Sequence, residues 1–414
     1  MKKFLTFLLA VMLVLTCFAL TACDEEEENT ETGTESEKQA VSLELSGSLI
    51  ENGNVLKDSA FPDDVTLKIV YSDDTKGESV TVTAEMVSGF DTATEGRKTA
   101  TVSYNELQAS VPYRVYSDEV QLKFYDGLGT KENPYQITTA QELQNVSEAL
   151  SASYILNNDI DLTDNLTDKV WAPIGNNIDD NSAFSGDFNG NGHTVSNLSV
   201  TTINVAEWDG YKNTYNYAGM FGVVTGKVYD LTLEDCTVLV TDEENEDRGD
   251  VYAGVLAGAN FGTITDVTVL NSSVSANAWL IASAGGLVGS NVGTVTACAA
   301  DGATVTAVSE GWTANAGGLI GASGDRLYWN VTATVSGSKA ENCTVLAKVT
   351  GAATTDDIDY PSPSTYFGRA YSGGLGGVKA MTTLSENTVN NNTYNAESYA
   401  SGNFILFTGE QWGY

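Results

Sequence analysis

The chain has 414 residues and a formal net charge of −35 at pH 7, from 55 acidic and only 20 basic side chains. A surface of this charge repels the phosphates of nucleic acids and anionic lipid head groups, so we expect neither as a partner, whereas cations, basic peptides and neutral glycans remain compatible. The length predicts two or three domains.

The first 22 residues predict a secretory signal peptide. Lys2 and Lys3 precede the apolar stretch FLTFLLAVMLVLTCFAL, which is short for a spanning helix and ends in small residues. Cys23 directly follows Leu-Thr-Ala, and this ending resembles the lipoprotein box of bacterial lipoproteins. The resemblance implies that Cys23 is lipidated, becomes the first residue of the mature protein and anchors it to a membrane through acyl chains. The alternative is an ordinary signal peptide with an incidental cysteine.

Residues 23–40 predict an acidic tether. The segment DEEEENTETGTESEKQA has no apolar periodicity and no aromatic residue, which is typical of a disordered chain. Repulsion between its like charges extends it, so we expect it to hold the rest of the chain away from the membrane.

Residues 41–122 predict an antiparallel β-sandwich. Short alternating runs such as VTLKIVYSDD and KTATVSY are separated by Gly, Asp and Asn. The segment VSGFDTATEGRKTATVSYNELQASVPYRVY, with VTLKIVYSDD before it, resembles bacterial immunoglobulin-like domains of cell-surface proteins. That resemblance implies a stalk or spacer.

An amphipathic helix is predicted over residues 139–151. Thr139 and Glu142 have the spacing of a capping box, and Leu143, Val146 and Leu150 follow at helical intervals. We expect this helix to cover the N-terminal end of the structure that follows, which otherwise presents an open sheet edge.

Residues 217–396 contain repeats. Five segments end in an equivalent glycine, and the steps between these glycines are 36, 31, 32 and 56 residues. The segments are YAGMFG (217–222), AGVLAG (253–258), GGLVG (285–289), GGLIG (317–321) and GGLGG (373–377). Each unit has three short apolar strands and cannot bury its own inward face, which predicts a stacked solenoid.

Stacking pairs each strand with its counterpart in the next unit at a spacing of about 4.8 Å, so residues 123–414 predict a parallel β-helix. We expect β-branched residues to fill the interior and glycines to form the corners. Asn260 and Asn291 stand before turn glycines, where we expect left-handed backbone geometry. Three cysteines outside the leader are an odd set, typical of buried packing residues rather than a disulfide framework: Cys236, Cys298 and Cys343.

The unit AGGLVGSN-GT resembles the GLUG-type repeat of bacterial surface proteins, and WAPIG with FSGDFNGNGHTVSNLSV resembles the coils that precede such repeats. The resemblance covers about residues 133–350, and the sequence departs from it after Gly351. It implies a right-handed parallel β-helix in secreted, adhesin-like proteins, some fused to peptidase domains, with no catalytic residues in the repeat. The expected fold is therefore all-β, an immunoglobulin-like sandwich followed by a right-handed parallel β-helix with a short N-terminal capping α-helix.

Few residues suggest chemistry. His193, in GNGHTV, is either a general base or part of a tight turn, and we favour the turn because no motif marks a nucleophile or partner carboxylate. Thr194 follows it and there is no second histidine, so the HExxH motif of a zinc peptidase is absent. The acids Asp159, Asp161 and Asp187 are candidates for polysaccharide cleavage, with Ile160 pointing inward between the first two.

No metal or cofactor is predicted. The acidic run TDEENEDRGD (241–250) offers oxygen ligands for calcium, but it lacks the spacing of an EF-hand, and such runs are usually solvated loops.

Aromatic residues stand just before the repeat units. They are Trp208, Tyr211, Trp279, Trp312 and Tyr366, the last beside Phe367. Equivalent positions of a solenoid stack, so we expect these loops to emerge on one side. The rings are candidates for stacking on sugars or anchoring peptide side chains, and the alternative is that each covers its own coil.

The sequence as a whole favours a lipid-anchored, adhesin-like protein displayed at the bacterial cell surface. It is expected to bind a glycan or a surface or matrix protein through loops of the β-helix, without catalysis. The alternatives are a polysaccharide lyase or glycoside hydrolase built on a β-helix, and a purely structural component of the envelope.

Overall fold

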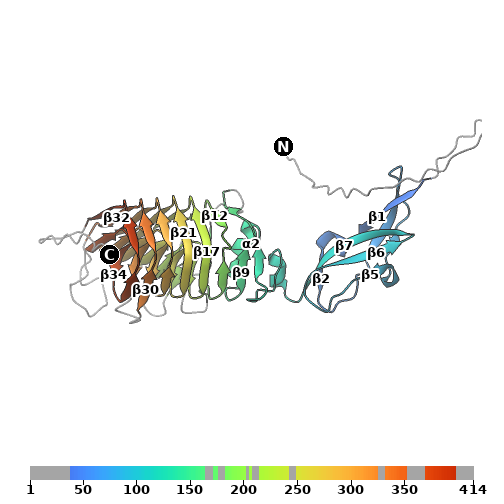
Figure 1. Ribbon diagram of the computed structural model, residues 1–414, viewed down its shortest axis with the longest axis horizontal. Helices are drawn as coiled ribbons and strands as arrows, with labels where there is room; N and C mark the ends of the chain where they lie inside the picture. Colours follow the sequence, from blue (N-terminus) through green and yellow to red (C-terminus); the bar gives the residue numbers. More distant parts are fainter. Residues whose placement is uncertain are drawn as a thin grey trace, which may run out of the picture.

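The computed structural model describes residues 38–163, 171–175, 182–201, 205–207, 214–241, 249–324, 332–351 and 369–397. Figure 1 shows a small β-sandwich followed by an elongated stack of strands. Cys23, with the leader and most of the tether, and the aromatic residues Trp208, Tyr211, Tyr366 and Phe367 lie outside the described residues.

The N-terminal unit is a sandwich of two sheets. One sheet has the order β1-β3-β4 and the other β2-β7-β6-β5. The bounds are β1 Ala40–Ser46, α1 Ser48–Asn52, β2 Asn54–Leu56, β3 Thr66–Tyr71, β4 Val80–Thr81, η1 Ala84–Met86, β5 Val87–Ser88, β6 Gly96–Tyr104 and β7 Leu107–Tyr116. Both sheets contribute to one apolar core, in which Leu67 of β3 and Val102 of β6 are fully buried. A two-sheet sandwich is present, and its immunoglobulin-like class stays a prediction.

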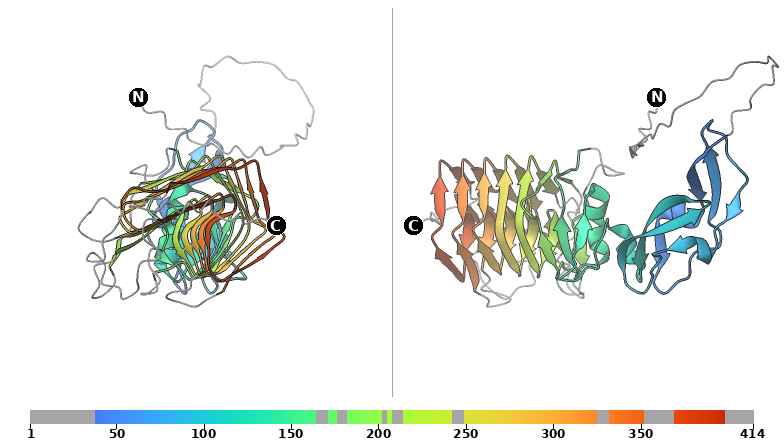
Figure 2. Two further views of the ribbon diagram at one scale, coloured as in Figure 1. Left: turned by 90° about the vertical axis from the view of Figure 1, so that its left-hand side faces the viewer. Right: turned by 45° about the vertical axis from the view of Figure 1, so that its right-hand side comes forward.

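The second unit is a parallel β-solenoid, seen along its axis and from the side in Figure 2. Four sheets run along it, and each coil visits them in the order IV, I, II, III. Sheet I consists of β8 Tyr135–Ile137, β9 Ser153–Leu156, β10 Ile160–Asp161, β11 Asp187–Asn189, β12 Thr194–Ser196, β17 Lys227–Glu234, β21 Thr263–Leu270, β25 Thr294–Thr296, β26 Ala299–Asp301, β30 Ala333–Ser336, β31 Lys339–Glu341, β35 Thr382–Ser385 and β36 Thr388–Asn390.

The other three sheets complete each coil. Sheet II consists of β13 Ser199–Val200, β18 Thr237–Thr241, β22 Ser273–Ala278, β27 Thr304–Ser309, β32 Thr344–Val349 and β37 Thr393–Glu397. Sheet III consists of β14 Val205–Glu207, β15 Thr214–Ala218, β19 Asp250–Gly254, β23 Ile281–Gly285, β28 Thr313–Gly317 and β33 Arg369–Gly373. Sheet IV consists of β16 Phe221–Val224, β20 Ala257–Asn260, β24 Val288–Asn291, β29 Ile320–Ser323 and β34 Gly376–Lys379. The fifth repeat, whose sequence is the most divergent, still forms a coil in register with the fourth.

The predicted stacking of parallel strands is confirmed. Pairing is parallel throughout the solenoid strands except between β14 and β15. Inward positions pair like with like, as in the column Val228, Ile264, Val295 and Val335, all fully buried. Each coil therefore buries its apolar face against its neighbours rather than against itself.

The predicted capping helix is present but shorter than residues 139–151. The α-helix α2 spans Ala140–Gln144 and continues as the 3₁₀-helix η3, Asn145–Glu148. The capping box is confirmed, because the Thr139 hydroxyl accepts the Glu142 N–H and the Glu142 carboxylate accepts the Thr139 N–H. The α-helix ends early because the Asn145 side chain donates to the Lys123 carbonyl at 2.8 Å and the chain tightens there. Leu143 is buried in the solenoid core, and α2 lies at its N-terminal end (Figure 1).

The sandwich and the solenoid are joined by two arginines. Between them the chain runs through the 3₁₀-helix η2, Glu119–Lys123. Arg114 of β7 is 5% exposed and donates to the carbonyls of Phe124 at 2.5 Å and Gly127 at 3.0 Å. Arg97 of β6 donates to the Tyr125 carbonyl at 2.6 Å and lies over the Tyr125 ring. These contacts tie the start of the solenoid to the β6–β7 hairpin of the sandwich, in which Arg97 and Arg114 face each other across the two strands.

The expectation that glycines form the corners is correct for the place of the repeated Gly-Gly segments, since Gly286, Gly318 and Gly374 lie in the two-residue connections from sheet III to sheet IV. However, none of these three has a positive φ. The corners of sheet I are turned by residues with positive φ, most of them Asp or Asn, which tolerate the left-handed conformation. One series is Asp230, Asp266, Ala297, Gly337 and Glu386, and the other is Asn197, Asp235, Asn271, Gly302, Asn342 and Asn391. Both series recur once per coil, so the turn chemistry is part of the repeat.

The repeated glycines are needed instead for close backbone approach between sheets III and IV. A Cβ added to Gly254 lies 2.5 Å from the Ala257 carbonyl oxygen, and one added to Gly289 lies 2.5 Å from the Ala253 nitrogen. Both contacts are with backbone, which has little room to move. The glycines are therefore fixed by packing rather than by turning.

The expectation of left-handed geometry at Asn260 and Asn291 is wrong. Both side chains are fully buried and form a ladder along the solenoid axis. The Asn260 Nδ2 donates to Asn291 Oδ1 at 2.8 Å, and the Asn291 Nδ2 donates to the Ser323 hydroxyl at 3.3 Å. Asn260 Oδ1 accepts the Gly262 N–H at 3.0 Å. Inside the coil, the asparagine side chains form hydrogen bonds with backbone groups and with one another, as buried polar groups must.

The prediction for the cysteines is confirmed. Cys236, Cys298 and Cys343 are free thiols and are buried. Burial raises the pKa of Cys236 to about 11 and that of Cys298 to about 12, so both remain protonated near neutral pH.

Candidate functional site

One corner of the solenoid, which we call the loop corner, carries connections of very different length. It lies between sheets II and III. Successive coils use eight, two, three and nineteen residues there: 242–249, 279–280, 310–312 and 350–368. In contrast, the connections from sheet III to sheet IV and from sheet I to sheet II all have two residues. In solenoids, such insertions gather on the face that binds.

Two of the predicted aromatic residues lie at the loop corner in adjacent coils. Trp279 follows β22 and Trp312 precedes β28. The Gly311 N–H donates to the Trp279 carbonyl at 3.1 Å, and the Trp312 N–H donates to the Ser309 hydroxyl at 3.0 Å. Both side chains are half-buried. The structure therefore places the two tryptophans at the same corner of adjacent coils, although not at equivalent positions, since Trp279 directly follows its sheet II strand and Trp312 directly precedes its sheet III strand.

The prediction that His193 belongs to a turn agrees with its surroundings. Its N–H donates to the Gly190 carbonyl at 2.9 Å, directly before β12. Its Nδ1 lies 3.1 Å from Asp159 Oδ1, a carboxylate that no sequence motif had marked as its partner. The same Asp159 oxygen accepts the Thr194 N–H at 2.9 Å. This backbone hydrogen bond, with the contact to His193, holds the pKa of Asp159 below its usual value.

The remaining two acids have different surroundings. Asp161 accepts hydrogen bonds from the Thr163 hydroxyl at 2.6 Å and from Asn197 at 2.9 Å, which lower its pKa. Ile160 is buried, so the predicted alternation between the two acids is confirmed. Asp187 begins β11 and faces outward, next to Lys227 in the sheet register. Asp159 and Asp161 thus hold turns, while Asp187 lies on an open sheet face.

The acidic run 241–250 is described only at its ends. At one of them, buried Asp250 accepts the Ile281 N–H at 3.0 Å from the next coil. Among the residues that the structure describes, no helix is long and apolar enough to cross a membrane. Within the same residues, no group of three or more His, Cys, Asp or Glu side chains is arranged to hold a metal ion.

No protein-family model matches the chain. Over 200 residues, 45% of the chain, the sequence is 30% identical to a protein named halomucin from Haloquadratum walsbyi, and the match spans 2% of that protein. Over 152 residues, 35% of the chain, it is 37% identical to a putative Gly-rich membrane protein from Evansella cellulosilytica, of which it spans 15%. The chain covers only a small part of either relative.

Proposed function

We propose that this chain is a lipid-anchored bacterial surface protein, in which an immunoglobulin-like stalk carries a GLUG-type solenoid. The solenoid binds a glycan, or a protein of a matrix or a neighbouring surface, through the loop corner and without catalysis. The leader and Cys23 support the location, and the name of the relative from Evansella cellulosilytica, a putative membrane protein, agrees with it.

The observation that carries the binding role is the variation in connection length at the loop corner. The connections from sheet III to sheet IV and from sheet I to sheet II keep two residues, and the corner from sheet IV to sheet I is longer in one coil, with nine residues at 324–332. In contrast, the loop corner varies from coil to coil and accepts up to nineteen residues. Trp279 and Trp312 add aromatic rings at the same place. Rings on a surface contribute about 0.5–1.5 kcal/mol each when they stack on a ligand, so two of them account for about tenfold in affinity or more.

The absence of catalysis is part of the proposal and is supported by how the candidate acids are used. Asp159 and Asp161 accept hydrogen bonds from turn residues, and His193 lies in a turn against the first of them. A released-sugar assay on acidic and neutral polysaccharides tests this directly. Product release by the full chain would favour a polysaccharide lyase or hydrolase, and binding without product supports the adhesin.

The binding test compares the full chain, solubilised in detergent, with the double variant Trp279→Ala, Trp312→Ala on a glycan array and on immobilised matrix proteins. We expect the variant to lose about tenfold or more of the binding of the unmodified chain. Leu239→Ala removes an apolar side chain that is 48% exposed on sheet II, away from the corner, and serves as the control. Trp312→Phe keeps a ring and is expected to retain binding. Equal binding by the double variant, with its circular dichroism unchanged, would remove the loop corner from the proposal.

The anchor has its own test. Cys23→Ser removes the acceptor for the lipid, so we expect the chain to move from the membrane fraction to the supernatant of the cells. A variant that stays in the membrane fraction would contradict lipid anchoring.

A further inference from the structure

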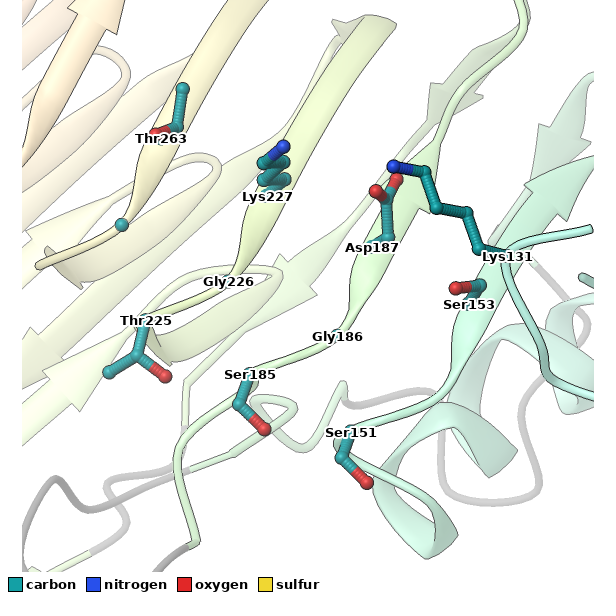
Figure 3. A pocket seen from close by; sticks show the side chains of 11 residues that line it. Lys131, Ser151, Ser153, Ser185, Gly186, Asp187, Thr225, Gly226, Lys227 and Thr263 are labelled. Carbon is teal, nitrogen blue, oxygen red and sulfur yellow. The ribbon is translucent and has the colours of Figure 1, made fainter.

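A second surface, remote from the loop corner, has the chemistry of a binding site. It is a shallow groove of about 360 Å³ on the outer side of sheet I, near its N-terminal end. Lys131, Asp187 and Lys227 supply its charges, and Ser153, Ser185 and Thr263 are among its hydroxyls. Figure 3 shows Lys131 reaching from a loop toward Asp187, with Lys227 on the neighbouring strand. We call this surface the lysine groove.

The floor of the lysine groove is a column of glycines. Gly186, Gly226 and Gly262 occupy the same position in three successive coils, directly before β11, β17 and β21. A Cβ on Gly226 would collide with the Gly186 carbonyl oxygen, and one on Gly262 would collide with the Gly226 carbonyl oxygen. The stacking of the coils therefore forbids side chains here. The groove is open because of the fold, and backbone groups line it.

The two lysines of the groove lie near one carboxylate, that of Asp187. Among the described residues, neither Lys131 nor Lys227 has a carboxylate oxygen within the 4.0 Å that defines an ion pair. Basic residues are scarce in this part of an acidic protein. Those described beyond residue 123 are Lys131, Lys227, Lys339, Lys348, Arg369 and Lys379. Two of these six line one groove, and with Asp187 they give its lining a net charge of +1 (two lysines and one aspartate) in a chain that is otherwise strongly acidic.

The surface beyond the groove continues as rows of hydroxyls. In the register of sheet I, Lys227 is followed by Thr263, Thr294 and Thr334 on successive coils. A second row beside it brings Thr296 and Ser336 within 3.2 Å of each other. These side chains face outward and are half-buried. A polymer with many hydroxyls can lie along the rows and place a charged unit in the groove.

We propose that the lysine groove binds a carboxylate-bearing sugar of an acidic polysaccharide, with the chain of the polysaccharide lying along the threonine rows. Lys131 and Lys227 hold the carboxylate by charge-assisted hydrogen bonds, and Asp187 accepts hydrogen bonds from sugar hydroxyls. The negative charge of the whole protein opposes the approach of a polyanion. Salt screens that repulsion beyond about 8 Å at physiological ionic strength, so the two ammonium groups decide binding at contact. This site is separate from the loop corner and extends the proposed function to a second ligand surface.

The test is calorimetric titration of the full chain, solubilised in detergent, with oligogalacturonate, a chain of uronic acids. The same oligomer with its carboxylates methyl-esterified is the uncharged control. We expect the charged oligomer to bind and the ester to bind at least tenfold more weakly. Lys131→Met and Lys227→Met keep the aliphatic stems and are each expected to lower the affinity about tenfold.

Lys339→Met is the matched control variant, because Lys339 is an exposed lysine on the outer side of the same sheet. We expect it to bind like the unmodified chain. No binding of the charged oligomer, equal binding of the ester, or an equal loss in Lys339→Met would each overturn the proposal. The variant Trp279→Ala, Trp312→Ala separates this site from the loop corner, since it is expected to keep its affinity for the oligomer even where its array binding is lost.

Discussion

The buried asparagine ladder makes a sharp prediction, because its residues look like turn residues in the sequence. Asn291→Ala removes the acceptor of the Asn260 amide at 2.8 Å and the donor to Ser323 at 3.3 Å. The Asn260 amide nitrogen keeps only a 3.3 Å hydrogen bond to the Thr294 carbonyl, while its Oδ1 still accepts the Gly262 N–H at 3.0 Å and Ser323 keeps the Thr382 hydroxyl at 3.1 Å. Two net hydrogen bonds of about 1 kcal/mol each, with a buried amide left poorly satisfied, predict a loss of about 2–4 kcal/mol in the free energy of unfolding.

The assay is urea unfolding followed by tryptophan fluorescence. All six tryptophans lie beyond residue 123, so the signal reports the solenoid and not the sandwich. Asn277→Ala is the control, since this asparagine points outward from a strand of sheet II and is only half-buried. We expect the control to change stability by less than about 0.5 kcal/mol, as surface substitutions usually do. A change in Asn291→Ala as small as that of the control would refute the role of the ladder.

Further predictions follow from the packing, the thiols, the junction and the acids. Gly226→Ala forces a Cβ into a backbone carbonyl and is expected to lower the free energy of unfolding by about 3 kcal/mol or more. Gly192→Ala places its Cβ in open space at φ +75° and is expected to lower the free energy of unfolding by only about 1–2 kcal/mol. The Cys298 thiol, with a pKa of about 12, should resist alkylation at pH 8 in the folded chain and react fully in urea; labelling of the folded chain would contradict its burial. Arg114→Met should broaden the distribution of shapes seen by small-angle scattering without moving the unfolding midpoint of the solenoid. Because the pKa of Asp159 lies below its ordinary 3.8 in the folded chain, its stabilisation is present above that pH and is lost as the pH falls through the folded value, so Asp159→Asn should flatten the loss of stability in acid.

The coil architecture could be predicted from the sequence because its determinants are local and repeated. The five closing glycines correctly align the strands of sheet IV, and the capping box at Thr139 and Glu142 correctly starts α2. Alternation also placed Ile160 inside. These features depend on neighbours in the chain or on a fixed step between copies, so they are visible without coordinates.

The structural roles of the repeated glycines and asparagines could not be predicted in the same way. Glycine serves both tight turns and close backbone approach, and asparagine serves both left-handed turns and buried ladders. Only the identity of the facing backbone distinguishes these uses, and that backbone belongs to another coil. Gly254 meets Ala257 and Asn260 meets Asn291 in space, which no local pattern reveals.

The lysine groove was missed for a related reason, although its signal is in the sequence. The segments GDFN (186–189), GKVY (226–229), GTIT (262–265) and GTVT (293–296) share a glycine followed by an outward, an inward and an outward residue. Aligning them puts Asp187 and Lys227 in the place where later coils have threonine. The position of Lys131, which comes from a loop before the first repeat, could not be found by that alignment.

The two proposed surfaces lie where the inner packing of the coil places no constraint. At the turn from sheet III to sheet IV, backbone contacts as close as those of Gly254 leave no room for an added residue, and every connection there has two residues. At the loop corner the chain leaves sheet II toward solvent, so its length can change without disturbing the next coil. Outward positions of sheet I are equally unconstrained, because the packed core between successive coils is formed by the inward side chains that alternate with them. Charge can therefore replace threonine at Asp187 and Lys227 without cost to the fold, which leaves these positions available for binding.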